Sequence, residues 1–332
     1  MTPTQKLNAQ TIPALGLGCW AIGGPFYSGE TPLGWGEVDD AVSIRAIETA
    51  VDLGVQFFDT AQAYGAGHSE IILGKALKHK PDVQIGTKVG YGIVPKTRQL
   101  TGAVVEIHAI KQSIEDSLMR LQRDHLDLVH LHLNEASIEN AAVIFECLAD
   151  FRRTGKVSSF GWSTDFPERA EAFATMPGFV SIQHAMNVFY RADMLIPTIE
   201  KHGLLSINRS PLAMGVLGGK HTAATKFNSS EVRGRTATWM DYFADGRIKP
   251  EYATRLASVR ELLQSDGRTL VQGALSWVWA RSNHTLPIPG FRTAAQVNEI
   301  AGTLAYGPLN DTVMSEIEKL IDREPEGTPR SR

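Results

Sequence analysis

Four polar side chains of complementary chemistry stand at or just after short apolar runs. Asp59 ends the run VQFFD, Tyr64 lies five residues beyond it, Lys88 follows QIGT, and His132 ends LDLVHLH. A tyrosine with a pKa of ~10 is a poor proton donor at neutral pH. A nearby lysine should lower that pKa, an aspartate can hold the lysine charged, and an imidazole can polarise a carbonyl oxygen. The set suits protonation of an oxygen as a carbonyl becomes an alcohol, with hydride from a cofactor.

The elements that must position these side chains alternate between strand and helix. Several of the strand-like runs are apolar on both faces, as in a buried parallel sheet. Eight such runs favour a closed (β/α)8 TIM barrel, an α/β fold, with a short hairpin predicted over Lys6–Ile12. The predicted strands are Ala14–Cys19, Val55–Asp59, Val83–Thr87, Leu126–His132, Val157–Trp162, Val180–Ala185, Leu204–Asn208 and Thr285–Ile288. The predicted helices are Asp39–Leu53, Ala109–Leu121, Ile138–Thr154, Glu168–Thr175 and Asp193–His202.

Composition predicts one soluble, cytoplasmic barrel domain over residues 1–322, followed by a disordered tail over 323–332. Of the 332 residues, 43% are hydrophobic and 21% charged, which is enough to form a large core. The net charge of −3 gives no reason to expect nucleic acid or a membrane as partner. The two cysteines, Cys19 and Cys147, lie far apart in the sequence and predict no disulfide framework.

Barrel enzymes carry their chemistry at the carboxyl ends of the strands, where all four side chains fall. The alternative, an open sheet that binds a dinucleotide, requires a glycine-rich turn that leads into a helix. Gly16–Ala21 resembles that turn, but a Gly/Pro/aromatic loop follows it, so we reject this interpretation. His130 and His132 point the same way on one strand. The position of His132 nearer the carboxyl end favours it as the functional histidine.

The separated motifs DTAQAYGAGHSE, GTK, LVHLH, SPLAMGVLGGK and IPGFRTAAQ resemble, in order, the signatures of the aldo-keto reductase superfamily. The resemblance runs from about Leu15 to Ile300. It implies a (β/α)8 barrel that binds extended NADP(H), with NAD(H) less favoured, and no metal. It also implies that Asp59, Tyr64, Lys88 and His132 form the catalytic tetrad, with Tyr64 as proton donor. The partner would be a small carbonyl or sugar substrate.

The same resemblance implies a set of cofactor contacts. Arg209 replaces the aromatic ring that many relatives stack on the nicotinamide, Thr164 replaces a frequent Asn, and Ile300 replaces another near the adenine. A guanidinium can also stack on a ring. Arg292 suits the 2′-phosphate that distinguishes NADP from NAD. The implied cofactor-binding residues are Gly18, Trp20, Ser163, Thr164, Gln183, Arg209, Ser210, Leu212, Gly215, Lys220, Gly290, Arg292, Gln296 and Glu299.

Other residues offer weaker alternatives. His68, Ser69 and Glu70 are hydrolase-like in type but adjacent in sequence, so helix capping by this segment is the preferred interpretation. Cys19 has no cation near it in sequence to lower its pKa and is interpreted as a packed thiol. Trp20, Phe26 and Trp35 are candidate apolar walls, and Gly24–Gly36, Ile93–Thr101 and Lys220–Pro250 are candidate pocket loops. The competing functions are a sugar or polyol dehydrogenase that uses NAD(P), and an NADPH-binding redox sensor with little catalysis.

Overall fold

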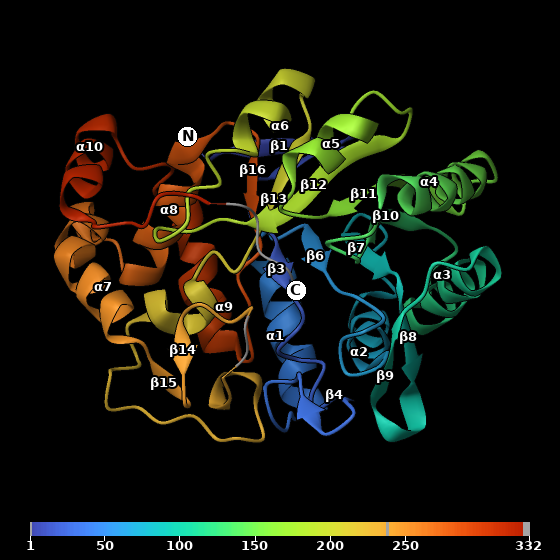
Figure 1. The fold of residues 1–332 in the computed structure, drawn as a ribbon, viewed down its shortest axis with the longest axis horizontal. Helices are drawn as coiled ribbons and strands as arrows, with labels where there is room; N and C mark the ends of the chain where they lie inside the picture. The colour runs from blue at the N-terminus through green and yellow to red at the C-terminus, as the bar shows by residue number, and fades with distance from the viewer. Residues whose placement is uncertain (1, 237–238, 328–332) are drawn as a thin grey trace.

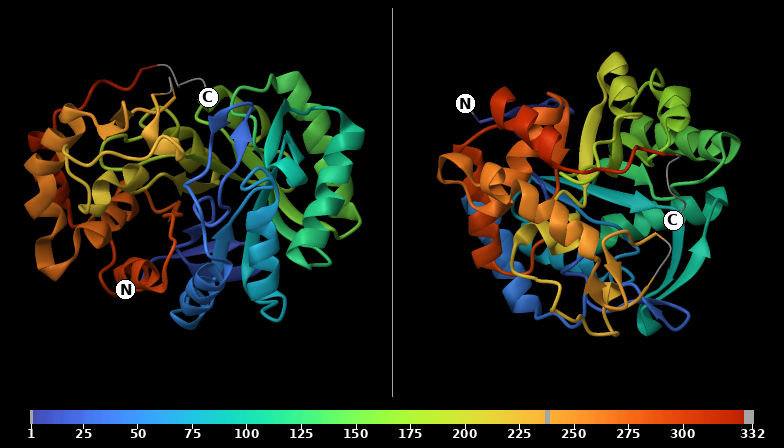
Figure 2. Two further views of the ribbon diagram at one scale, coloured as in Figure 1. Left: turned by 90° about the horizontal axis from the view of Figure 1, so that it is seen from below. Right: turned by 60° about the vertical axis from the view of Figure 1, so that its left-hand side comes forward.

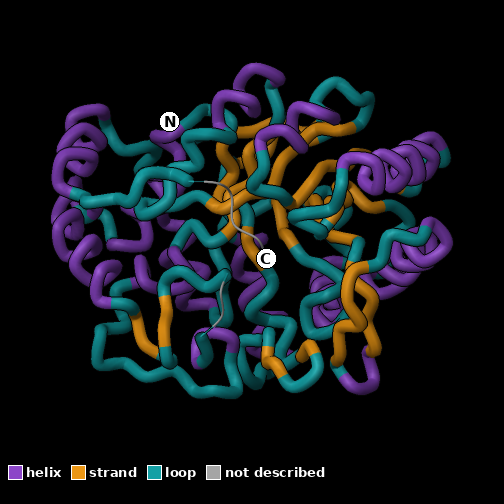
Figure 3. The backbone as a smooth tube through the Cα atoms, viewed as in Figure 1, coloured by secondary structure: helices purple, strands orange, loops and turns teal. Residues whose placement is uncertain are grey.

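The computed structural model describes residues 2–236 and 239–327, which form a barrel of eight parallel strands surrounded by helices (Figures 1 and 3). Hydrogen bonds join the strands in the order β16-β13-β12-β11-β10-β7-β6-β3. Their bounds are β3 (Leu17–Gly18), β6 (Phe57–Asp59), β7 (Gln84–Val89), β10 (Leu126–Leu131), β11 (Val157–Ser163), β12 (Phe179–Ala185), β13 (Leu205–Arg209) and β16 (Thr285–Pro287).

The barrel closes between β3 and the residues that follow β16. Gly18 N donates to Pro289 O at 2.9 Å, and a parallel bridge pairs Gly18 with Gly290. A Cβ on Gly18 would lie 2.8 Å from the carbonyl oxygen of Ile288, so the two backbones can approach this closely only at a glycine. The predicted (β/α)8 barrel is confirmed, and each of the eight predicted runs overlaps one strand.

Helices cover the outside of the barrel, and all five predicted helices are present with small shifts of their ends. Helix α8 (Leu270–Arg281) is not among the predicted helices, because every residue from Leu270 to Trp279 is buried and no polar face alternates with an apolar one. The described helices are α1 (Asp40–Asp52), α2 (His68–Leu77), α3 (Ile107–Leu121), α4 (Ile138–Arg153), α5 (Pro167–Phe173), α6 (Ile196–His202), α7 (Pro250–Leu263), α8 (Leu270–Arg281), α9 (Ala294–Ala301) and α10 (Asp311–Leu320).

The predicted N-terminal hairpin is also present, as the antiparallel strands β1 (Thr4–Leu7) and β2 (Gln10–Pro13). Asn8 adopts a φ of 54° in its turn, a conformation that asparagine tolerates better than most residues. Leu7 and Ile12 of the hairpin belong to one buried cluster with side chains of the barrel strands. The hairpin therefore seals one end of the barrel and leaves the carboxyl ends of the strands for the pocket.

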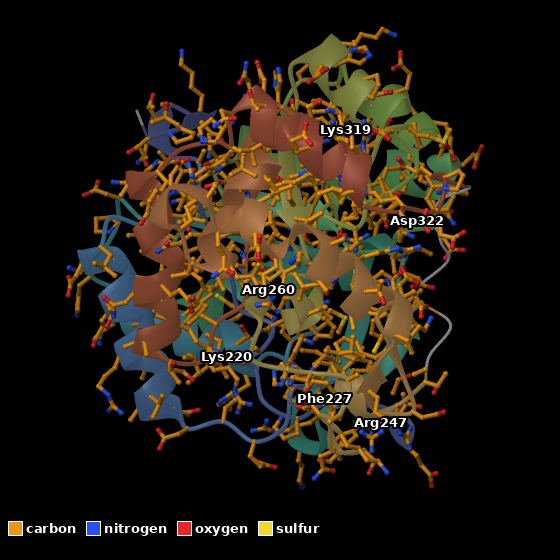
Figure 4. The ribbon with its side chains drawn as sticks, turned by 90° about the vertical axis from the view of Figure 1, so that its left-hand side faces the viewer. Lys220, Phe227, Arg247, Arg260, Lys319 and Asp322 are labelled. Carbon is orange, nitrogen blue, oxygen red and sulfur yellow. The ribbon has the colours of Figure 1, made fainter. Side chains whose placement is uncertain are left out.

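Three loops build walls above those carboxyl ends. The loops after β3 and β7 pair into a four-stranded sheet of β5 (Thr31–Pro32), β4 (Tyr27–Ser28), β9 (Gln99–Ala103) and β8 (Tyr91–Val94). The long loop 220–249 contains η3 (Val232–Gly234), β14 (Phe243–Ala244) and β15 (Arg247–Ile248). It lies with α7 on one side of the barrel, with α2–α4 on the other (Figure 2), and Figure 4 views it from outside. Val232 N donates to Gly34 O at 2.8 Å, which ties this loop to the loop after β3.

The segment after α10 packs against the body of the protein over the residues that the structure describes. Arg323 Nε donates to Val188 O at 2.7 Å, and the same guanidinium forms an ion pair with Glu318. Glu326 accepts from Asp193 N. Residues 328–332 of the predicted tail lie outside the described residues. Among the described helices, none is both long and apolar enough to cross a bilayer.

Candidate active site

The end of β6, the loop after it and β7 bring together three side chains of the predicted tetrad. Lys88 is fully buried, and its Nζ donates to Asp59 Oδ2 at 2.6 Å, to Thr60 O at 2.8 Å and to Tyr64 OH at 3.2 Å. Gln183 of β12 donates from Nε2 to Asp59 Oδ1 at 2.7 Å. The Lys88 amine thus has three hydrogen-bond acceptors, and the carboxylate is held on both oxygens.

Burial and the neighbouring charges set the protonation states of this cluster. Burial lowers the pKa of Lys88, but Asp59 and Tyr64 oppose it and the net pKa is raised, so the amine stays charged. Burial raises the pKa of Tyr64, and Lys88 offsets only part of that rise. We expected Lys88 to lower the Tyr64 pKa below its ordinary value. The net direction is upward instead, because burial of the phenol dominates, and Tyr64 is held in its protonated form.

The two histidines of the LVHLH motif occupy different environments. The His132 ring stands edge-on to Tyr64 at a centroid distance of 5.8 Å and to Tyr91 at 5.3 Å. His130 is fully buried, with Nε2 2.9 Å from Ser181 Oγ, and burial holds its pKa well below the ordinary value. His132 borders the pocket and His130 does not, as the order along the strand predicts.

A pocket of about 680 Å³ opens above these residues. Its walls include the aromatic rings of Trp20, which stacks on Tyr64 at 6.0 Å, and of Trp35, which meets Trp20 edge-on at 5.4 Å. Phe26 is part of the same wall, so all three predicted wall residues line the pocket. The predicted site residues that line it are Gly18, Trp20, Asp59, Tyr64, His132, Ser163, Gln183, Arg209, Ser210, Leu212, Gly215, Lys220, Gly290, Arg292, Gln296 and Glu299.

Two predicted residues stand behind the pocket wall. Lys88 lies beneath Asp59 and Tyr64 and reaches the pocket through them. Thr164 is fully buried and its Oγ1 donates to Asn134 O at 2.9 Å, while Asn134 itself borders the pocket. The threonine that replaces a frequent asparagine therefore contacts the backbone, and an asparagine from the loop after β10 lies at the wall.

One end of the pocket is cationic. Lys220, Arg233 and Arg292 line it, beside a histidine, His221, whose pKa is lowered by burial and by the neighbouring cations. The long loop supplies Arg233, which packs its guanidinium 4.7 Å from the Trp35 ring centroid and forms an ion pair with Glu231. Arg233 is not among the predicted site residues, because its place at the pocket depends on the path of the long loop. The charge pattern of this end suits a polyanion.

The turn that follows β13 forms part of the same wall and has an unusual backbone. Ser210, Ala213 and Met214 have positive φ values of 53°, 47° and 53°, and Gly215 has a φ of 99°. Non-glycine residues rarely hold this conformation, and clusters of such residues occur at ligand-binding turns. The turn brings backbone to the pocket surface beside the cationic end.

The hydrolase-like set His68, Ser69 and Glu70 does not form one site. His68 Nε2 lies 2.8 Å from Asp40 Oδ1, and Ser69 Oγ donates to Cys19 O at 2.9 Å. The predicted capping role of this segment is wrong, because α2 begins at His68 and no side chain caps it. Glu70 is buried and instead accepts from Thr87 Oγ1 at 2.5 Å and from Arg120 Nε at 2.6 Å.

Cys19 is a packed thiol, as predicted. Its side chain is fully buried, and burial raises its pKa well above the ordinary value, so it is held as the unreactive thiol. Within residues 2–236 and 239–327, no group of three His, Cys, Asp or Glu side chains could hold a metal ion.

A closed barrel with a polar cluster and a cation-lined pocket at the carboxyl ends of its strands has the architecture of a barrel enzyme. The chain belongs to the Aldo/keto reductase family, whose sequence model matches residues 14–322. This is a family of NADP-dependent oxidoreductases.

Known proteins similar to the chain support this assignment. Aldo-keto reductase YhdN of Bacillus subtilis is 28% identical over 316 residues, which cover 93% of this chain and 89% of YhdN. The solved structure of glycerol dehydrogenase AKR11B4 from Gluconobacter oxydans has a TM-score of 0.80 and 26% identity, with 99% of each chain covered. An aldo-keto reductase from Klebsiella pneumoniae, solved in complex with NADPH, shares the fold at a TM-score of 0.70 and 21% identity, with 100% of this chain and 99% of that chain covered.

Proposed function

We propose that the protein reduces aldehydes or ketones to alcohols with NADPH, with Tyr64 as the proton donor. The observation that carries this proposal is the position of Lys88 Nζ, which is 2.6 Å from Asp59 Oδ2 and 3.2 Å from Tyr64 OH. A buried cation beside the phenol stabilises the negative charge that develops on its oxygen as the proton leaves. The raised pKa of Tyr64, caused first by burial, keeps the proton available at neutral pH.

The bound nicotinamide would supply the hydride. Tyr64 gives its proton to the carbonyl oxygen, and Asp59 holds Lys88 charged beside the resulting phenolate. His132, edge-on to Tyr64, hydrogen-bonds the same carbonyl oxygen and orients the substrate. The aromatic wall of Trp20, Phe26 and Trp35 excludes water from the reacting group.

The residues that line the pocket fit an extended dinucleotide with several phosphates. Lys220 and Arg233 provide cations beside the backbone turn of Ser210–Gly215, which suits a diphosphate. Arg292 suits the 2′-phosphate, which favours NADP(H) over NAD(H). Its Nη1 donates to Trp35 O at 3.1 Å, so the guanidinium is already held at the pocket edge. Gln296 and Glu299 border the pocket on α9 and suit the adenosine.

The second candidate function is oxidation of a polyol or sugar alcohol by the same site. The similarity to a glycerol dehydrogenase favours it. In that direction Tyr64 must start as a phenolate, and its raised pKa opposes this at neutral pH. Reduction is therefore the primary proposal.

The test is an NADPH-oxidation screen over aldehydes, ketones and sugars, repeated with NADH, and run in reverse with polyols and NADP⁺. We expect turnover of at least one carbonyl class, faster with NADPH than with NADH. Faster polyol oxidation than carbonyl reduction near pH 7 would favour the dehydrogenase. Tight NADPH binding without turnover of any compound would indicate the redox-sensing alternative.

A further inference from the structure

A second buried ion pair, separate from Asp59–Lys88, lies at the carboxyl ends of β11 and β13. Arg209 is the last residue of β13, and its Nη2 donates to Asp165 Oδ2 in the loop after β11. Asp165 is only 7% exposed, and its Oδ1 accepts from Ala185 N at 2.9 Å. The carboxylate is therefore fixed by backbone and holds the guanidinium in one place.

Arg209 borders the same pocket as Tyr64 and Gln183. Gln183 contacts Asp59 directly, so this side of the pocket adjoins the proton-transfer group. Burial raises the pKa of Tyr64, and the Arg209 cation is among the charges that oppose the rise. Because Arg209 ends β13, the neighbour of the strand that carries Gln183, its guanidinium lies on the same side of the pocket as the proton-transfer group.

The position of the hydride donor follows from the proposed function, on which this inference rests. A hydride must travel to the carbon of the carbonyl whose oxygen contacts Tyr64, across a separation of ~3–3.5 Å. The pocket wall that adjoins Tyr64 on the side of β11, β12 and β13 is formed by Ser163, Gln183 and Arg209. A nicotinamide within reach of that carbon is therefore exposed to the Arg209 charge.

The two redox forms of the cofactor differ in charge only at the nicotinamide ring. The oxidised ring carries one positive charge and the reduced ring is neutral, whereas the phosphates and adenosine are the same in both. We propose that the Arg209–Asp165 ion pair sets the relative affinity for the two forms: the Arg209 cation disfavours the oxidised ring, and the Asp165 carboxylate limits that penalty. The ratio of the dissociation constants for NADP⁺ and NADPH isolates this effect, because the shared contacts cancel.

The consequence for the enzyme is a bias toward reduction. A site that binds NADPH more tightly than NADP⁺ loads the reduced form and releases the oxidised product readily. A neutral aromatic ring in place of Arg209 would lack this charge effect. Arg209 and Asp165 are thus specificity-determining residues for the redox state of the cofactor.

The experiment measures the dissociation constants of NADP⁺ and NADPH by calorimetry for the full chain and three variants. Arg209→Gln leaves Asp165 without its cation, so the dissociation constant for NADP⁺ divided by that for NADPH should fall about tenfold. Asp165→Asn leaves the cation without its carboxylate but keeps a side-chain oxygen that can accept from Ala185 N, so the ratio should rise about threefold. Arg209→Lys keeps the charge and should leave the ratio within about twofold of the parent.

The control is Arg292→Gln, which should weaken the binding of NADP⁺ and of NADPH equally because both carry the 2′-phosphate. Opposite shifts in the first two variants support the proposal, since a purely structural role would not produce them. Unchanged ratios, or shifts in the same direction, overturn it. If Arg209→Gln does not fold by circular dichroism, Asp165→Asn still tests the sign of the shift in the ratio, with Arg209→Lys as the charge-conserving reference. A parent protein that binds neither form would overturn the proposed function itself.

Discussion

Two buried carboxylate–cation pairs stand at the carboxyl ends of the barrel strands, and they differ in what the cation faces. Lys88 is fully buried, and its amine hydrogen-bonds Asp59 and Tyr64. The Arg209 side chain is 13% exposed and borders the pocket space directly, while Asp165 holds it from behind. The same kind of pair can therefore tune a side chain when its cation is enclosed, or act on a ligand when its cation borders the cavity.

A buried histidine accompanies each pair and is kept neutral. Burial lowers the pKa of His130 well below its ordinary value, and Lys88 lowers it further. Burial lowers the pKa of His184 to about 4, with Asp165 opposing and Arg209 adding to the shift. The charges of each pair thus shift the pKa of a neighbouring histidine, which takes up a proton only under acid conditions.

The largest expected effect tests whether the Lys88 pair acts through Tyr64. Tyr64→Phe removes the proton donor but keeps the ring that stacks on Trp20. Turnover in carbonyl reduction should fall about 10³-fold, within the range for loss of a general acid. The NADPH dissociation constant, measured by calorimetry, should change less than about twofold. Full activity in this variant would disprove the assignment of Tyr64.

The next largest effect separates a role of the Asp59–Lys88 pair in folding stability from a role in catalysis. Lys88→Met leaves the Asp59 carboxylate buried beside only the Gln183 amide, which should destabilise the fold by about 3–5 kcal/mol. Denaturant unfolding measures this loss. The double variant Asp59→Asn/Lys88→Met removes both charges, so it should regain most of the stability and stay inactive. Recovery of activity in the double variant would contradict a role for the charged pair.

The proximity of Asp59 and Lys88 could be predicted from the sequence, whereas that of Asp165 and Arg209 could not, for a physical reason. Asp59 ends β6 and Lys88 lies one residue before the end of the neighbouring parallel strand β7, so their proximity follows from the order of the strands alone. Asp165 and Arg209 lie 44 residues apart, Asp165 in the loop after β11 and Arg209 at the end of β13, which is not a neighbour of β11, so their contact depends on the path of that loop. The position of Arg233 could not be predicted from the sequence either, because it depends on the path of loop 220–249.

The helix-capping prediction for the segment His68–Glu70 failed for a related reason. A carboxylate near the start of a helix has a local role that sequence can suggest, but Glu70 pairs with Arg120, which lies 50 residues away. Several of the eight strands were predictable because burial on both faces makes their sequences largely apolar. Side-chain partners across the sheet leave no such periodic signal.

A smaller effect concerns the histidine beside the second pair. His184 has a pKa of about 4 in the folded protein and 6.5 as its ordinary value. As the pH falls, His184 therefore takes up a proton in the unfolded chain before it does so in the folded protein. The contribution of neutral His184 to the free energy of unfolding is fully present above pH 6.5 and is lost as the pH falls toward 4, by at most about 3 kcal/mol. His184→Asn should flatten the change in unfolding free energy between pH 7 and pH 4 by up to that amount. An unchanged pH dependence in denaturant titrations would show that His184 does not titrate on unfolding.

The smallest expected change is in the pH profile of the parent enzyme. Reduction uses protonated Tyr64, and burial raises its pKa above 10 even though Lys88 opposes the rise. The rate of carbonyl reduction at saturating NADPH should therefore vary less than about twofold between pH 7 and pH 9, whereas polyol oxidation, which needs the phenolate, should rise steadily over the same range. Steady-state rates in both directions measure this contrast. A fall in the reduction rate below pH 9 would mean that Lys88 outweighs burial at Tyr64 in the working enzyme, and the Lys88 pair would then stabilise the phenolate before substrate arrives.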